Sequence, residues 1–201
     1  MKAVYLHGLG SSGSSATAQR LRRSLPNSIE VLSPDIPVQP EMAISFLRRF
    51  AAQHLGPDDI IVGTSMGALY AQLFKGWRRI LVNPSFHTSR HLAEKIGQRL
   101  PFHTPRQDGA TDFEVNQKLI KKFEKLEADQ FSPKFGIFNP RHKDSPEQVT
   151  GFFGSRDTVV NCRPEFSEHF SDLREFDGEH RLDPDTTLNL IVPEIRAHFG
   201  L

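Results

Sequence analysis

A short glycine-containing segment, residues 63–67 (Gly-Thr-Ser-Met-Gly), constrains the fold most, because it follows the apolar run 60–62 and precedes a helical pattern at 68–75. A G-x-S-x-G sequence between a strand and a helix predicts a sharp turn that strains the serine backbone and exposes the serine hydroxyl. The N–H of Met66, at the helix start, is expected to point to where an oxyanion would form. Ser65 is therefore a candidate nucleophile, and the alternative is a turn that is merely rich in small residues.

Short apolar runs alternate with segments of helical period along most of the chain. This alternation predicts stacked β-α units, and hence an α/β fold: a mostly parallel six-stranded sheet with helices on both faces. The expected strands are residues 3–6, 30–32, 60–62, 80–82, 150–153 and 174–176. The length of 201 residues and the even composition predict one domain, residues 1–201.

The alternation stops between residues 84 and 146, where no run predicts a strand convincingly. An insertion of this size is usually functional, so we expect a helical cap over the active site at about residues 86–140. A strong helical stripe at 115–126 includes Leu119 and Phe123. These two side chains either dock the cap helix onto the sheet domain or line an acyl pocket and bind the substrate.

A serine nucleophile needs a base and an orienting acid, and in α/β-hydrolases they follow the serine in the order acid, then histidine. Asp157 comes after the expected strand 150–153, at the edge where open α/β sheets build their sites. His180 lies in a glycine-containing loop after the last expected strand. We predict Asp157 as the acid and His180 as the base. Asp157 could instead be an ordinary loop or capping residue, and Asp35, after the second expected strand, is the rival acid.

A second oxyanion donor is expected from the loop at residues 7–12, which follows the first strand. Its glycines let backbone N–H groups approach a ligand, so the N–H of Leu9 beside that of Met66 would complete an oxyanion hole. We expect His7 to fix this loop by hydrogen bonding rather than to transfer protons. Residues 8–13 also match G-x-G-x-x-G, but dinucleotide binding would leave the serine and the histidine base unexplained.

No cofactor or metal is expected. His87 and His91 are four residues apart and could share a helix face, but no third ligand has the spacing of a metal site. The 25 Lys and Arg residues nearly balance the 24 Asp and Glu residues, so no overall charge favours nucleic acid or an anionic membrane. The single cysteine, Cys162, suits a reducing compartment, and the first apolar run is too short for a membrane span. We therefore expect a cytoplasmic protein with a small-molecule partner, and leave the oligomeric state open.

Five segments together resemble the YqiA/YcfP group of small bacterial α/β-hydrolases, over nearly the whole chain. They are the His7-Gly8 loop, Gly63-x-Ser65-x-Gly67, Asn83-Pro84, Gly154-x-x-Asp157 and Gly178-x-His180. The resemblance implies an esterase-like hydrolase with a triad of Ser65, Asp157 and His180. Our leading hypothesis is hydrolysis of carboxylic esters or thioesters through an acyl-enzyme. The alternatives are perhydrolysis or C–C bond hydrolysis on the same triad, and a non-catalytic binding protein on a hydrolase scaffold.

Overall fold

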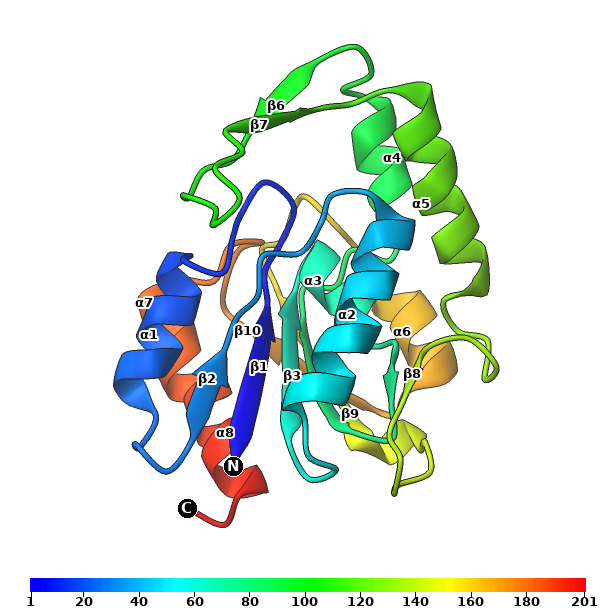
Figure 1. The fold of residues 1–201 in the computed structure, drawn as a ribbon. Helices are drawn as coiled ribbons and strands as arrows, with labels where there is room; N and C mark the ends of the chain where they lie inside the picture. Colours follow the sequence, from blue (N-terminus) through cyan, green and yellow to red (C-terminus); the bar gives the residue numbers. More distant parts are fainter.

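The computed structural model describes residues 1–201 and is built around one six-stranded sheet (Figure 1). Its strands are β1 (Lys2–Leu6), β2 (Glu30–Leu32), β3 (Ile60–Thr64), β5 (Arg78–Val82), β9 (Val149–Gly154) and β10 (Asp172–Phe176). They lie in the order β10-β9-β5-β3-β1-β2, and every pair is parallel. All six strands predicted from the sequence are confirmed, and so is the α/β fold.

The parallel register brings the carboxyl ends of the strands to one edge of the sheet. Leu6 at the end of β1 pairs with Gly63 of β3, and Thr64 pairs with Val82 at the end of β5. Phe176 at the end of β10 likewise pairs with Gly154. The loops that follow these strands therefore start close together, which is the arrangement that builds ligand sites in open α/β sheets.

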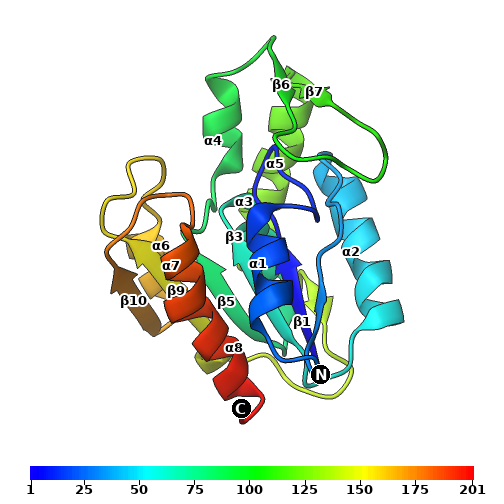
Figure 2. The same ribbon diagram turned by 90° about the vertical axis from the view of Figure 1, so that its left-hand side faces the viewer.

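Helices cover both faces of the sheet, because side chains alternate between the faces along each strand. Val4 and Leu6 of β1 pack under α2 (Pro40–His54) and α3 (Met66–Ala71), whereas Ala3 and Tyr5 pack on the other face. That other face is covered by α1 (Ala16–Ser24), the π-helical turn η2 (Thr187–Ile191) and α8 (Val192–His198). Figure 2, turned toward that side, shows α1 and α8 in front of the sheet. Two further short helices are α6 (Arg163–His169) and α7 (Pro184–Thr186).

The segment between β5 and β9 holds both helices and short strands. Its elements are α4 (Thr88–Ala93), β6 (Arg99–Pro101), β7 (Asp112–Glu114), α5 (Gln117–Asp129), β8 (Ile137–Phe138) and the 3-10 turn η1 (Pro146–Gln148). The expectation that no strand lies here was wrong: β6 and β7 form an antiparallel hairpin, and β8 pairs with β4 (Phe74–Lys75). Strands of two or three residues leave too short a pattern to detect. Figure 1 shows α4, the hairpin and the start of α5 above the carboxyl edge of the sheet.

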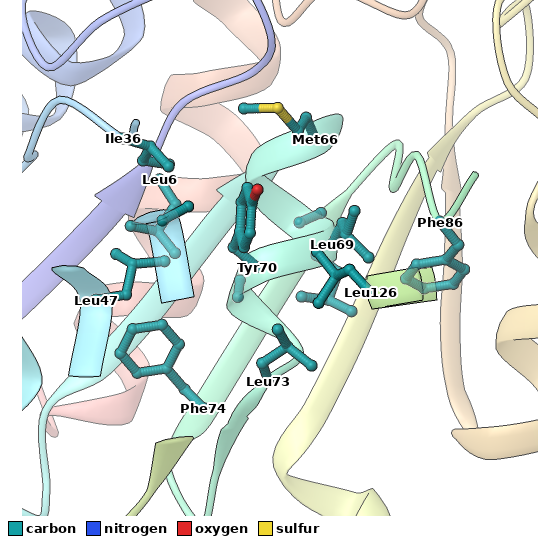
Figure 3. Close-up of a cluster of buried hydrophobic side chains, with 14 of the residues drawn as sticks. Leu6, Ile36, Leu47, Met66, Leu69, Tyr70, Leu73, Phe74, Phe86 and Leu126 are labelled. Atoms are coloured by element: carbon teal, nitrogen blue, oxygen red, sulfur yellow. The ribbon is translucent and has the colours of Figure 1, made fainter. Parts of the chain in front are cut away.

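Helix α5 packs its apolar stripe into the larger of two hydrophobic clusters. Leu119 and Phe123 are fully buried there, and Asn116 caps the helix by accepting a hydrogen bond from the N–H of Leu119 (3.0 Å). Figure 3 shows part of this cluster, with Tyr70 of α3 in its middle and Leu126 of α5 at its side. No helix in the structure combines the length and the apolar character that a membrane span requires.

Candidate active site

Ser65 occupies a strained turn between β3 and α3. Its φ is +54°, a left-handed value that is unusual for a residue with a Cβ atom. The two flanking glycines are required by close packing: a Cβ at Gly63 would lie 2.3 Å from the carbonyl oxygen of Gly67, and one at Gly67 would lie 2.0 Å from that of Leu6. The turn is fixed by a hydrogen bond from the Ser65 N–H to the carbonyl of Val82 (3.0 Å). The serine hydroxyl is thus presented at the carboxyl edge of the sheet.

The structure brings Ser65, His180 and Asp157 together, although they lie far apart in the sequence. The Nε2 atom of His180 is 2.9 Å from Oγ of Ser65, and its Nδ1 atom is 2.8 Å from Oδ2 of Asp157. A carboxylate can only accept hydrogen bonds, so Nδ1 carries the hydrogen and the lone pair of Nε2 faces the serine. The Asp157 side chain is only 5% exposed and that of His180 is 17% exposed. This is the arrangement in which a histidine can take a proton from a serine hydroxyl.

The carboxylate of Asp157 is held by its own loop. Its Oδ1 atom accepts hydrogen bonds from the N–H groups of Val159 (2.8 Å) and Val160 (3.1 Å), which leaves Oδ2 for His180. Asp157 also donates its own N–H to the carbonyl of Gly154 at the end of β9 (3.1 Å). The hydrogen bonds within this loop therefore fix the orientation of the Asp157 carboxylate independently of His180.

Asp35, the rival acid, is engaged elsewhere. Its two carboxylate oxygens accept hydrogen bonds from the N–H of Gly13 (2.7 Å) and the N–H of Gln107 (2.6 Å). Asp35 lies in the loop after β2. Its two bonds tie this loop to the loop that precedes α1 and to the loop between β6 and β7. Asp35 thus joins two loops, and the contact with the imidazole of His180 belongs to Asp157.

Asn83 is a residue of this site whose role the sequence did not reveal. It follows β5, is 1% exposed and has a φ of +43°, a conformation that Asn tolerates better than most residues. Its Nδ2 atom donates to the carbonyls of Glu179 (2.9 Å) and His180 (3.1 Å), and its Oδ1 accepts from the N–H of Gly154 (2.7 Å). One amide thus links the loop of His180 to the end of the strand that leads to Asp157. The only sequence signal was an Asn-Pro pair directly after a strand.

His7 is buried under the loop that follows β1, and both ring nitrogens have partners. Nδ1 donates to the carbonyl of Gly8 (2.9 Å), and Nε2 accepts from the N–H of Ile36 (3.1 Å). Burial lowers the pKa of His7 to about 4, so the ring is neutral at pH 7. The loop that it holds lies against Ser65, since a Cβ at Gly8 would be 3.4 Å from that of Ser65. His7 is therefore a structural support, as expected.

The two backbone donors proposed for an oxyanion, the N–H groups of Leu9 and Met66, follow the strands β1 and β3. Leu9 lines the same pocket as Ser65, and its N–H donates no hydrogen bond within the protein. Met66 is the first residue of α3, so its N–H belongs to the first turn, where such groups lack an acceptor within the helix. Both donors are thus available to a group bound at the serine.

A pocket of about 320 Å³ opens at Ser65 and His180. Leu9 lines it from the body of the protein, and His103 and Thr104 line it from the inserted segment. Leu119 and Phe123 are not among its lining residues, because the buried stripe of α5 faces the core instead. Their placement therefore favours packing over the substrate contact that we predicted for them.

The inserted loop over this pocket is fastened to the body by hydrogen bonds. The N–H of His103 donates to the carbonyl of Gly10 (2.7 Å), and Oγ of Ser12 donates to the carbonyl of Pro105 (2.8 Å). Farther from the pocket, His87 does not pair with His91; its Nε2 atom instead lies 2.8 Å from Oε2 of Glu165 in α6. These contacts connect the insertion to the sheet domain at two separate places.

Comparison with solved structures shows which fold this is. The chain is similar to alpha/beta hydrolase domain-containing protein 10 from mouse, with a TM-score of 0.67, 13% identity, and coverage of 99% of this chain and 89% of that one. It is also similar to Est1E from Butyrivibrio proteoclasticus (TM-score 0.64, 12% identity, 100% and 88% coverage). A third similar structure is the type II thioesterase BorB from the borrelidin biosynthetic cluster (TM-score 0.55, 14% identity, 99% and 91% coverage). The chain thus has the α/β-hydrolase fold.

A comparison of the sequence with models of protein families shows the family of this chain. The model of the family described as "Uncharacterised protein family (UPF0227)" matches residues 2–182. This range runs from β1 to the loop after β10 and includes Ser65, Asp157 and His180. The chain therefore belongs to this family, the YqiA/YcfP family of α/β-hydrolases.

Proposed function

We propose that this protein is a serine hydrolase that cleaves carboxylic esters or thioesters through an acyl-enzyme. The observation that carries the proposal is the pair of hydrogen bonds of His180, one to Ser65 (2.9 Å) and one to Asp157 (2.8 Å). The family and the fold favour a hydrolase. One protein of similar fold, BorB, is a type II thioesterase, which supports thioesters as a substrate class.

In the proposed acylation step, Oγ of Ser65 attacks the carbonyl carbon while its proton passes to Nε2 of His180. The N–H groups of Leu9 and Met66 bind the negative oxygen of the tetrahedral intermediate. The C–O or C–S bond then breaks, and the leaving group takes the proton from Nε2. Asp157 holds the imidazole and stabilises its positive charge throughout.

Deacylation repeats these steps with water as the nucleophile. Water gives one proton to Nε2 of His180 and attacks the acyl carbon, and the acid leaves as Ser65 regains that proton. The inserted segment would act as a cap, since His103 and Thr104 border the pocket where the acyl or alcohol group must lie. The single cysteine suits a cytoplasmic location for this chemistry.

The test is turnover of a panel of 4-nitrophenyl esters and acyl thioesters of graded length. We expect hydrolysis by the wild-type protein and by Ser28→Ala, a control at an exposed serine, and none by Ser65→Ala. Removing the nucleophile from a serine protease costs on the order of 10⁶ in kcat. Equal turnover by Ser65→Ala and the wild-type protein would rule out the proposed mechanism.

A further inference from the structure

The pocket at Ser65 combines apolar surface with many hydroxyl groups. Half of the 14 residues that line it carry a hydroxyl group, and three are aliphatic: Leu9, Ala16 and Leu182. Pockets that take apolar acyl chains are lined mainly by aliphatic and aromatic side chains. The volume of about 320 Å³ favours a small substrate, and the hydroxyl groups can form hydrogen bonds with polar groups on it.

The charged lining of the pocket has one sign. Arg181 lines it directly after the proposed base, and no Asp or Glu is among the lining residues. Arg181 is exposed and forms no ion pair or side-chain hydrogen bond within the protein. The pocket thus holds a cation that is free to bind a ligand.

The carboxylate of Asp183, two residues after Arg181, already has hydrogen-bond partners. Asp183 accepts hydrogen bonds at Oδ1 from the N–H of Thr186 (2.6 Å) and at Oδ2 from the hydroxyl of Thr186 (2.9 Å), and so caps α7. These bonds hold the Asp183 carboxylate at the helix start. Neither Asp183 nor the exposed Glu179 forms an ion pair with Arg181, which lines the same pocket as Ser65.

We propose that the natural substrate is a short ester or thioester with a carboxylate group near the scissile bond, and that Arg181 binds this carboxylate. The inference rests on the proposed function and adds the substrate class. An arginine presents several N–H donors in a planar array that matches the geometry of a carboxylate. The hydroxyl groups around it can donate to the same anion.

The test uses two pairs of esters that match in shape and differ in charge. Monoethyl succinate and ethyl 4-methylpentanoate differ in the acyl group, where a carboxylate replaces an isopropyl group. Acetoxyacetate and isobutyl acetate differ in the same way in the alcohol. Hydrolysis is followed with the full chain in a pH-stat, and kcat/KM is compared within each pair.

We expect the anionic member of one pair to have a kcat/KM about 10-fold or more above its neutral partner, since a hydrogen bond to a charged group is worth roughly that factor. The pair that shows the preference tells whether the carboxylate lies on the acyl or the alcohol side. Arg181→Gln should remove the preference and Arg181→Lys should retain part of it. Arg196→Gln, which removes an exposed charge on α8, should leave it unchanged.

A binding measurement gives a result even if turnover of these simple esters is slow. Succinamate and 4-methylpentanamide are uncleaved amides of the same two shapes, and each is tested for protection of Ser65 against a fluorophosphonate probe. We expect succinamate to protect at about 10-fold lower concentration, and this advantage to vanish in Arg181→Gln.

Equal kcat/KM within both pairs, together with equal protection by the two amides, would overturn the inference and leave the proposed function intact. A preference that persists in Arg181→Gln would overturn the assignment of Arg181. If the wild-type protein neither hydrolysed any of these esters nor reacted with the fluorophosphonate probe, the proposed function would instead be contradicted.

Discussion

Asn83 and His180 are joined by a hydrogen bond from the side-chain amide of Asn83 to the main-chain carbonyl of His180 (3.1 Å). The same amide accepts the N–H of Gly154, at the end of the strand that leads to Asp157. One buried side chain, which does not line the pocket, therefore connects the loop of His180 to the strand that leads to Asp157.

Replacing Asn83 should impair catalysis more than stability alone explains. In Asn83→Ala the loops of His180 and Asp157 lose a shared anchor, so we expect kcat to fall by roughly 10- to 100-fold with little change in KM. Asn139→Ala is the matched control, because Asn139 bridges the carbonyls of Pro57 and Gly76 away from the site. Both variants should lose about 1–3 kcal/mol of unfolding free energy, but only Asn83→Ala should lose kcat. Equal kcat in the two variants would contradict a positioning role.

Substitution of the two candidate acids, Asp157 and Asp35, should have different effects on catalysis and on stability. Asp157→Asn should lower kcat by roughly 10²- to 10⁴-fold, because the imidazole loses its orientation and charge support. Asp35→Asn should lower the melting temperature instead, since its carboxylate accepts two backbone N–H groups. Steady-state kinetics and thermal unfolding of both variants decide this, and the opposite pattern would show that Asp157 is not the acid.

Burial of His7 should make stability depend on pH. Its pKa is lowered from 6.5 to about 4, so between these values the unfolded chain binds more protons than the folded one. The stability that the neutral ring contributes is fully present above about pH 6.5 and is lost as the pH falls toward 4. Lowering the pH from 7.5 to 5 should cost about 2 kcal/mol through this residue.

Urea unfolding at the two pH values measures this loss. His7→Gln should be less stable at pH 7.5 but should lack the part of the pH dependence that His7 contributes. His54→Gln, a control at an exposed histidine, should keep it. If His7→Gln and the wild-type protein lose the same free energy between pH 7.5 and 5, the ring does not titrate as described.

The buried stripe of α5 should act on stability and not on specificity. Leu119→Ala and Phe123→Ala remove fully buried side chains, and each should cost about 2–5 kcal/mol of unfolding free energy. Neither should change the ratio of kcat/KM values between short and long acyl esters. Leu182→Ala, at a residue that lines the pocket, should change that ratio while costing less stability. A changed ratio in Phe123→Ala would restore the substrate-binding role that we first predicted.

The central fold was predictable because its strands leave continuous signals. β1, β3, β5 and β9 lie between two helical layers, so each contains apolar residues in a short run that stands out from its surroundings. β6, β7 and β8 were not predictable, since they contain two or three residues each and depend on pairing with partners set by the tertiary structure.

The candidate site was predictable to the extent that its residues follow strand ends. Ser65, Asp157 and His180 all do, and the order of these residue types pointed to their meeting. The apolar stripe that includes Phe123 correctly predicted that this side chain is buried. It could not predict which surface Phe123 packs against, because a helical period shows only that one face of the helix is apolar. Asn83 was missed because its partners lie 71 to 97 residues away in the sequence, in loops whose meeting depends on the folded sheet.

Mapping a fluorophosphonate adduct by peptide mass spectrometry tests most directly whether Ser65 is a nucleophile activated by His180. We predict one adduct on Ser65 in the wild-type protein, none in Ser65→Ala, and labelling slowed by at least about 10²-fold in His180→Ala, where no base takes the serine proton. An adduct on a different residue, or labelling of Ser65 at an undiminished rate in His180→Ala, would contradict the claim.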